Sequence, residues 1–409
     1  MQTFKQYWKV VVLGVLVVSN AVFVGYIFSD SLFALFAHDE YAQVLEDFSE
    51  VPPQFDTVGK FFLNIANERG AVYAFEILKR AQIPPNIDIH LVGHLIGDEL
   101  YKQQGIEGMK YCTHDFRNAC SHTVVIGALL EDGLSVLDQV HDVCKKAPGG
   151  SGAYTMCFHG FGHGVLAYTE YDVADATELC RQVGTKEFSN REYHECAGGI
   201  TMEMVSGIHD PDLWAKKRLE YVREDDPLAL CKNDAFPDDV KPMCYVYITP
   251  EIFTAAGADL NTPNPDTFKK AFSYCAALPV SEVSNREACF GGLGKEFVVL
   301  VQDRDIRKIN ETPDEKLARI DTWCALAGEG DGQQSCLTYA LNSLYWGGEN
   351  DANVSIRFCG LLSEDGNRTQ CFEQLISNVS FFVRDSAYRE HFCSALPDEF
   401  MSQCRARLQ

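Results

Sequence analysis

The chain has 409 residues, 46% of them apolar, and a formal net charge of -23 from 58 acidic and 35 basic residues. This charge argues against binding to nucleic acid or to anionic lipid, because an acidic surface repels phosphate groups. Length and composition allow two or three compact domains or one extended repeat array, and do not choose between them.

The first feature along the chain is an apolar stretch at residues 10–28, in which only Ser19 and Asn20 are polar. It is long enough to cross a bilayer as one helix, and the lysines of residues 1–9 favour a cytoplasmic position for that short segment. We expect an uncleaved signal anchor with the main domain outside the cytoplasm, in the periplasm, at the cell surface or in a secretory lumen. A cleaved signal peptide is the alternative, because Ser19 and Ala21 are small residues spaced as at the cleavage site of a signal peptidase.

Residues 29–55 are expected to form a stalk or linker, and all sixteen cysteines follow it. An even number of cysteines in an exported chain predicts disulfides. The sequence has no Cys-X-X-Cys motif, which excludes thioredoxin-like, zinc-ribbon and attached-haem sites. Four glycosylation sequons are present, at Asn310, Asn353, Asn367 and Asn378.

The cysteines recur as pairs with a regular sequence context. A stretch with helical spacing precedes the first cysteine of a pair, a polar or glycine-rich connection follows it, and the second cysteine lies at the start of another apolar stretch. We therefore expect a disulfide within each pair, tying the end of one helix to the start of the next. The pairs are Cys112 and Cys120, Cys144 and Cys157, Cys180 and Cys196, Cys231 and Cys244, Cys275 and Cys289, Cys324 and Cys336, Cys359 and Cys371, and Cys393 and Cys404.

This spacing predicts an all-α domain over residues 56–409, built from about eight to nine helical hairpins. Because one hairpin buries too little apolar surface alone, the units should stack into an α-solenoid or a closed α/α toroid. A first unit without cysteines should consist of one helix over residues 57–82, a break at residues 83–86 and a second helix over residues 87–105.

Histidines recur in register at the start of the second helix of three consecutive units. His159 and His163 lie two and six positions after Cys157, and His122 lies two positions after Cys120. The segment HLVGHLIGD aligns with them if Asp88 takes the place of the cysteine. Since residues four apart share a helix face, we expect one histidine-lined surface holding a divalent transition metal, with Zn or Fe favoured. The predicted ligands are His90, His94, Asp98, His122, His159 and His163.

Glutamates occupy the seventh position after the cysteine in three further units, at Glu203, Glu251 and Glu296. They are the candidate catalytic bases or additional ligands, and the alternative is that they face solvent or pair with a base such as Lys295. The glycines around the histidines, among them Gly160, are expected to allow close helix packing. Five further histidines are expected to be structural: His114, His141, His194, His209 and His391.

These features favour a metal-dependent enzyme, a hydrolase or an oxidase or hydroxylase, anchored through residues 10–28. The alternative is a non-catalytic receptor or scaffold that binds a protein, peptide or glycan on its concave face. The layout resembles that of deoxyhypusine hydroxylase, a helical-repeat protein whose equivalent helices supply His and Glu ligands to two irons. The resemblance is limited to this layout, because residues 90–100, HLVGHLIGDEL, lack the His-Glu dipeptides of that family.

Overall fold

The computed structural model describes residues 40–85, 87–113, 115–147, 150–207, 209–328, 330–347 and 352–408. The expected anchor at residues 10–28 lies outside the described residues. The chain divides into two units, Met1–Val51 and Pro52–Gln409. The first unit contributes helix α2 (Ala42–Phe48), and all other elements described below belong to the second.

Every named element of the described residues is a helix, and the one non-helical pairing among them is an isolated bridge between Arg223 and Asp226. The predicted all-α class is therefore confirmed for the described part of the chain. The helices that precede a connection are α3 (Phe55–Arg69), α4 (Ala71–Arg80), α7 (Leu137–Cys144), α9 (Val173–Val183), α12 (Ala229–Lys232), α15 (Pro265–Ala276), α17 (Asp314–Cys324), α19 (Asn353–Leu361) and α21 (Ser386–Ala395).

The helices that follow a connection carry the second cysteine of each pair. They are α5 (Ile89–Gln104, without a cysteine), α6 (Asp115–Asp132), α8 (Gly150–Tyr168), α10 (Arg191–Ser206), α13 (Lys241–Tyr247), α16 (Val283–Leu300), α18 (Asp331–Gly347), α20 (Asp365–Phe382) and α22 (Asp398–Leu408). The remaining elements are α11 (Pro211–Tyr221), α14 (Thr249–Ala256) and the short helices η1 (Gly105–Tyr111), η2 (Gly133–Val136), η3 (Ile306–Glu311) and η4 (Ala325–Ala327).

All eight predicted disulfides are present with the predicted pairing. Because such bridges persist where thiols are not kept reduced, they indicate an oxidising, extracytoplasmic environment. Stacking of the hairpins as a solenoid or a closed toroid stays a prediction, as do the boundaries expected for the anchor and stalk.

The prediction of one helix over residues 57–82 is wrong. Gly70 has a φ of +97°, which ends α3 and begins α4 in a new direction. This backbone region is open to glycine and strained for residues with a Cβ, so a single glycine divides an otherwise helical pattern.

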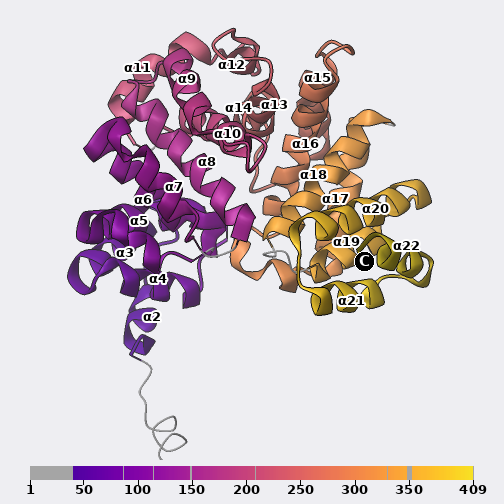
Figure 1. Ribbon diagram of the computed structural model, residues 1–409, viewed down its shortest axis with the longest axis horizontal. Helices are drawn as coiled ribbons and strands as arrows, with labels where there is room; N and C mark the ends of the chain where they lie inside the picture. Colours follow the sequence, from indigo (N-terminus) through magenta and orange to yellow (C-terminus); the bar gives the residue numbers. More distant parts are fainter. Residues whose placement is uncertain are drawn as a thin grey trace, which may run out of the picture. The chain divides into compact units, whose positions relative to one another are not determined.

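The helices that carry the histidines pack side by side. Helix α5 lies against α6, α6 against α8, and α8 against α10 (Figure 1). Glycines allow this close approach: a Cβ on Gly160 would lie 2.3 Å from the Cα of His122, and one on Gly199 would lie 1.9 Å from the carbonyl oxygen of His159. The expectation that these glycines serve helix packing is confirmed.

One described helical stretch, Asp115–Cys144, is long and apolar enough to cross a membrane by length and composition. Its apolar side chains instead form core: Val124, Val125 and Leu129 are fully buried within the second unit. The stretch is therefore explained as a core segment that positions His122.

Segments far apart in the sequence meet within the second unit. The guanidinium of Arg307, on η3, donates hydrogen bonds of 2.7 Å to the carbonyl oxygens of Leu78 and Ala81 at the end of α4. Near this junction, Arg117 donates to the hydroxyl of Ser343 on α18 at 3.2 Å. These contacts place residues of η3, α6 and α18 near one another.

Candidate metal centre

Six histidine rings form one contiguous cluster inside the second unit. Five of them are the predicted histidines of α5, α6 and α8, and the sixth is His209, which follows α10. Neighbouring ring centroids are 4.5 Å apart for His90 and His94, 5.5 Å for His94 and His122, 5.5 Å for His122 and His159, 5.2 Å for His159 and His163, and 5.9 Å for His163 and His209.

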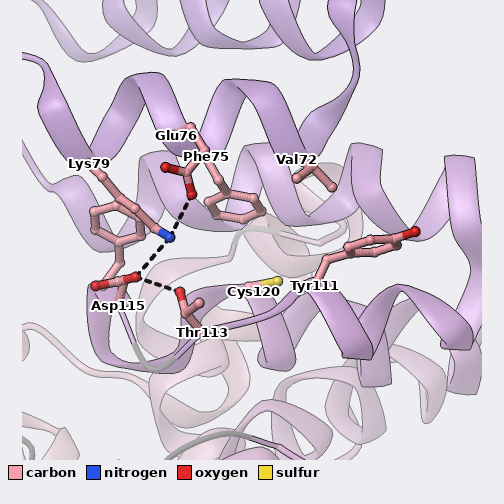
Figure 2. Close-up of a pocket in the computed structure, with 9 residues that line it drawn as sticks. Val72, Phe75, Glu76, Lys79, Tyr111, Thr113, Asp115 and Cys120 are labelled. Carbon is pink, nitrogen blue, oxygen red and sulfur yellow. Dashed lines mark hydrogen bonds and ion pairs between the residues drawn. The ribbon is translucent and has the colours of Figure 1, made fainter. Parts of the chain in front are cut away.

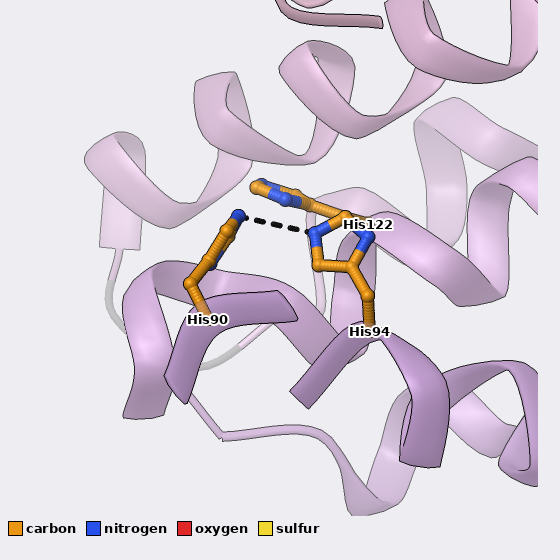
Figure 3. Close-up of side chains that lie close together, drawn as sticks. All are labelled: His90, His94 and His122. Carbon is orange, nitrogen blue, oxygen red and sulfur yellow. Dashed lines mark hydrogen bonds between the residues drawn. The ribbon is translucent and has the colours of Figure 1, made fainter. Parts of the chain in front are cut away.

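His90, His94 and His122 form the first group that could hold a metal ion, with one nitrogen of each within 4.8 Å of the others. His90 donates from Nδ1 to the carbonyl oxygen of Phe116 at 2.6 Å, which leaves its Nε2 as an acceptor. That Nε2 lies 3.1 Å from Nε2 of His94, and the ring of His122 lies alongside both (Figure 3). A backbone carbonyl that fixes the orientation of a ligating imidazole is a recurrent support of metal sites.

The carbonyl of Phe116 is held in place by an unusual turn. Phe116, Arg117 and Asn118 all have left-handed φ angles, of 56°, 53° and 64°. Such a conformation costs residues with a Cβ of order 1 kcal/mol each, and strained backbone of this kind concentrates at functional sites. The turn aims the Phe116 carbonyl at His90, and the next side chain, Arg117, donates to Ser343 on α18.

Contacts on α4 anchor the start of this turn. Lys79 lies 3.2 Å from the carboxylate of Asp115, and the hydroxyl of Thr113 donates to the same carboxylate (Figure 2). The ring of Phe116 stacks on Phe75, with centroids 6.2 Å apart and planes inclined by 15°. The pocket between these side chains has a volume of only about 20 Å³, so it has room for water and not for a larger ligand.

His163, Glu203 and His209 form the second group that could hold a metal ion. Both histidines donate from Nδ1 to Oε2 of Glu203, at 3.1 Å from His163 and 2.7 Å from His209. The other carboxylate oxygen, Oε1, accepts from the hydroxyl of Tyr171 at 2.8 Å and from the backbone N–H of His209 at 3.1 Å. With four donors already on it, Glu203 is suited to orient the two imidazoles so that each presents Nε2 as a ligand.

The ionisation of this group follows from the same contacts. Burial alone would raise the pKa of Glu203, but the hydrogen bonds from His163 and His209 hold its pKa well below the usual range. Burial would likewise lower the pKa of His209, but the Glu203 carboxylate raises it. Burial lowers the pKa of each of the other histidines of the cluster, namely His90, His94, His122, His159 and His163.

The cluster has many buried ring nitrogens without a hydrogen-bond partner among the described residues. These are Nδ1 of His94 and His159, both nitrogens of His122, and Nε2 of His163 and His209. Leaving a buried polar atom unpaired costs about 1–3 kcal/mol, and native proteins rarely tolerate several in one place. Since a neutral imidazole nitrogen is a transition-metal ligand, metal ions would satisfy these atoms.

Asp98 lies one turn after His94 on α5 and is close enough to His209 and Glu203 to respond to their charges. Burial raises its pKa to about 6, although His209 opposes that shift. His159 is at the other end of the cluster, with Nδ1 4.0 Å from a carboxylate oxygen of Glu195 and Nε2 3.4 Å from the sulfur of Met202. His159 thus borders the first group, its ring centroid 5.5 Å from that of His122, and Asp98 belongs to neither group.

The three predicted glutamates have different surroundings. Glu203 is fully buried among the histidines, whereas Glu251 forms an ion pair with Arg218. Glu296 has a carboxylate oxygen 3.0 Å from the ammonium of Lys295. This ion pair is the alternative that the sequence left open for Glu296. Glu251 differs from Glu203 because α13 ends at Tyr247 and α14 begins at Thr249, so the register counted from Cys244 does not run along one helix.

His209 and Glu195 are the residues of this region that sequence reasoning missed. His209 lies in the connection between α10 and α11, outside the repeating helix positions, and its expected structural role is replaced by membership of the cluster. Its one local signal is the separation of six residues from Glu203 across Gly207, whose φ of +62° turns the chain back toward the carboxylate. Burial raises the pKa of Glu195 to about 7.

No family model, curated protein or solved structure matches this chain.

Proposed function

We propose that this protein is a metal-dependent enzyme whose centre holds two divalent transition-metal ions side by side. The first ion is held by His90, His94 and His122. The second is held by Nε2 of His163 and His209 together with Asp98, and Glu203 orients the two imidazoles. The observation that carries the proposal is the set of buried ring nitrogens in this cluster that have no partner among the described residues.

The ligand chemistry favours Zn or Fe. Imidazole and carboxylate suit both metals, and three protein ligands at each ion would leave a position for water or substrate. A metal in such a position lowers the pKa of bound water or polarises a substrate oxygen, which is the basis for hydrolysis, and two His with one carboxylate also suit an iron oxidase. Asp98 has a raised pKa and lies beside the second group, so it is also placed to exchange a proton with a bound ligand.

The wider setting of the proposal is an exported helical-repeat domain anchored by residues 10–28. The packing order of α5, α6, α8 and α10 supports equivalent helices aligned side by side, as in a stacked array. The rival function, a scaffold that binds a protein, peptide or glycan without catalysis, does not explain why a histidine cluster is buried with its nitrogens unpaired.

Metal content tests the proposal directly. The full chain, purified in detergent without a histidine tag and dialysed to remove loose ions, should retain close to two equivalents of Zn or Fe by elemental analysis. His94→Ala combined with His163→Ala should abolish this content while the far-ultraviolet circular dichroism stays unchanged. His391→Ala is the matched control, because His391 is exposed on α21 and should keep the metal.

A folded wild-type chain that retains no transition metal, and takes none up when Zn²⁺ or Fe²⁺ is supplied, would remove the proposed function. Metal that remains in the double variant would show that other residues hold it.

A further inference from the structure

A second feature of this unit is a cavity of about 340 Å³ next to the histidine cluster. Its size is in the range of small-molecule sites, which are enclosed and mostly apolar with a few convergent polar groups. The walls come from the turn that opens α6 and from α8, α10, α13, α16, η3 and α18. The side chains that matter most are Arg117, Arg191, Lys295, Tyr247, Met156 and Trp346.

Cations dominate the charged groups of this cavity, although the whole chain has a net charge of -23. Among the described residues, no carboxylate lies within 4.0 Å of the guanidinium of Arg117 or of Arg191. Arg117 donates instead to the neutral hydroxyl of Ser343, and Arg191 lies over the ring of Phe382 at 5.4 Å. A guanidinium held by neutral partners keeps most of its donors for another acceptor.

The other charges of the wall are largely balanced. Arg307 is paired with Asp305 at 2.6 Å, and Asp115 is paired with Lys79 on α4 at 3.2 Å. Lys295 lies 3.0 Å from Glu296 and 4.3 Å from the centre of the Tyr247 ring. Glu195 is the remaining acid that lines the cavity. Once these pairs are set aside, the two cations Arg117 and Arg191 remain against one acid, Glu195, which lies close enough to Arg191 to respond to its charge. The wall therefore keeps a cationic excess.

The rest of the lining is suited to an apolar or aromatic body. Met156, Tyr247 and Trp346 line the space, and the close fit of Trp346 against α8 requires a glycine: a Cβ on Gly152 would lie 2.3 Å from the indole ring. Asn118, Asn342 and Ser343 add neutral hydrogen-bonding groups near Arg117. We infer that this cavity binds a small organic anion, a carboxylate or a phosphate monoester, whose charged group lies at Arg117 and Arg191.

The cavity adjoins the histidine cluster at His159, which borders the first group of proposed ligands, through two of its lining residues. The Tyr247 ring lies 4.6 Å from the ring of His159, and a carboxylate oxygen of Glu195 lies 4.0 Å from Nδ1 of His159. Phe116 and Arg117 connect the two sites through the backbone, since the Phe116 carbonyl holds His90 while the next side chain enters the cavity. The anion is therefore the substrate of the centre; this assignment of substrate class rests on the proposed function, whereas the binding of the anion does not.

Binding to the chelator-treated full chain tests the inference without any contribution from metal. The probes are phenyl phosphate and benzoate, compared with neutral phenol and with cationic benzylamine, measured by isothermal titration calorimetry. At least one anion should bind at least tenfold more tightly than phenol, and benzylamine should bind no better than phenol. The tighter of the two anions identifies the preferred charged group.

Variants locate the site. Arg117→Gln and Arg191→Gln should each weaken binding of the tighter anion at least tenfold and leave phenol binding unchanged. Arg405→Gln is the control, because Arg405 lies on α22 in an ion pair with Glu390 and outside the cavity lining. Should Arg117→Gln fail to fold, Arg191→Gln and the comparison of probes on the wild-type chain still decide the question.

Equal affinity for phenyl phosphate, benzoate and phenol would overturn the inference, as would the absence of anion binding to a chain with all eight disulfides and native helicity. A chain that binds the anion but no metal keeps this site and loses the proposed enzyme. A chain that binds metal but no anion keeps the metal centre and loses this inference.

Discussion

His209 donates from Nδ1 to Oε2 of Glu203 at 2.7 Å, although the two residues belong to different segments of the unit, the connection after α10 and α10 itself. The same oxygen accepts from His163 on α8, so one carboxylate controls the direction of two imidazoles. Since a carboxylate behind a ligating histidine fixes its tautomer and raises its basicity, this relationship makes Glu203 a positioning residue of the proposed centre.

Replacing this carboxylate should weaken metal binding without removing a ligand. Glu203→Gln is expected to lower the affinity for Zn²⁺ about 10–100-fold, because the amide is neutral and its NH2 group cannot accept from the backbone N–H of His209 as Oε1 does, so the acceptor that orients the two imidazoles is weakened and displaced. Competition with a chromophoric chelator measures the affinity. Glu251→Gln is the matched control, since Glu251 pairs with Arg218 and its loss should leave metal affinity unchanged. Equal effects of the two substitutions would contradict the role of Glu203.

The two histidine groups should be separable by mutation. His122→Ala removes a ligand of the first ion and His209→Ala a ligand of the second, so each variant should retain about one equivalent of metal where the wild type retains two. Elemental analysis of the dialysed proteins measures this, with circular dichroism to confirm the fold. A complete loss in one variant and no loss in the other would show a single ion held by one group.

Acid should destabilise the chelator-treated protein. Burial lowers the folded-state pKa of His94, His122 and His159. Below pH 6.5, the ordinary pKa of histidine, these residues are therefore protonated in the unfolded chain but stay neutral in the folded chain. Each such residue makes the free energy of unfolding fall by up to about 1.4 kcal/mol per pH unit as the pH drops below 6.5.

His209 has the opposite sign, because Glu203 raises its pKa despite burial. Its contribution is present below 6.5 and is lost as the pH rises through its folded-state pKa. Asp98 and Glu195 act in the same direction as His209, because burial raises their pKa values to about 6 and about 7. The five histidines with lowered pKa values outnumber these three groups, so urea unfolding should show lower stability at pH 5.5 than at pH 7.5. His122→Phe should reduce this difference and His391→Ala should preserve it; a stability independent of pH in this range would contradict the burial of neutral histidines.

Close packing of α8 and α10 should depend on single glycines. Gly199→Ala would place a Cβ 1.9 Å from the carbonyl oxygen of His159, so the two helices must separate, at a cost of about 1–3 kcal/mol or more. Metal content should fall with it, because His159 and His163 would move away from Glu203. Gly360→Ala on α19 is the control: its Cβ would meet no atom within 4 Å, and at this exposed helical position alanine should add up to about 1 kcal/mol of stability. Thermal unfolding and elemental analysis measure both effects, and a neutral result for Gly199→Ala would contradict the packing.

The repeat of cysteines was sufficient to predict the helical class and every disulfide pair, because short cysteine-to-cysteine separations in a periodic pattern leave few alternative pairings. The same register predicted five of the six clustered histidines and Glu203. The register does not run along one helix to Glu251, because Pro250 lies in the first turn of a new helix, and the carboxylate pairs with Arg218, the kind of contact given as the alternative from the sequence.

By itself the sequence determined the helical class, the disulfide pairs and the shared helix face of His90 and His94 and of His159 and His163, since these follow from local periodicity. Only the tertiary structure decided that His209 meets Glu203, that Arg117 turns from the histidines into a cavity, and that Trp346 closes that cavity against Gly152. The physical reason is that these contacts join segments without a common period, so they depend on how far the glycines let the helices approach and on where the chain turns between them.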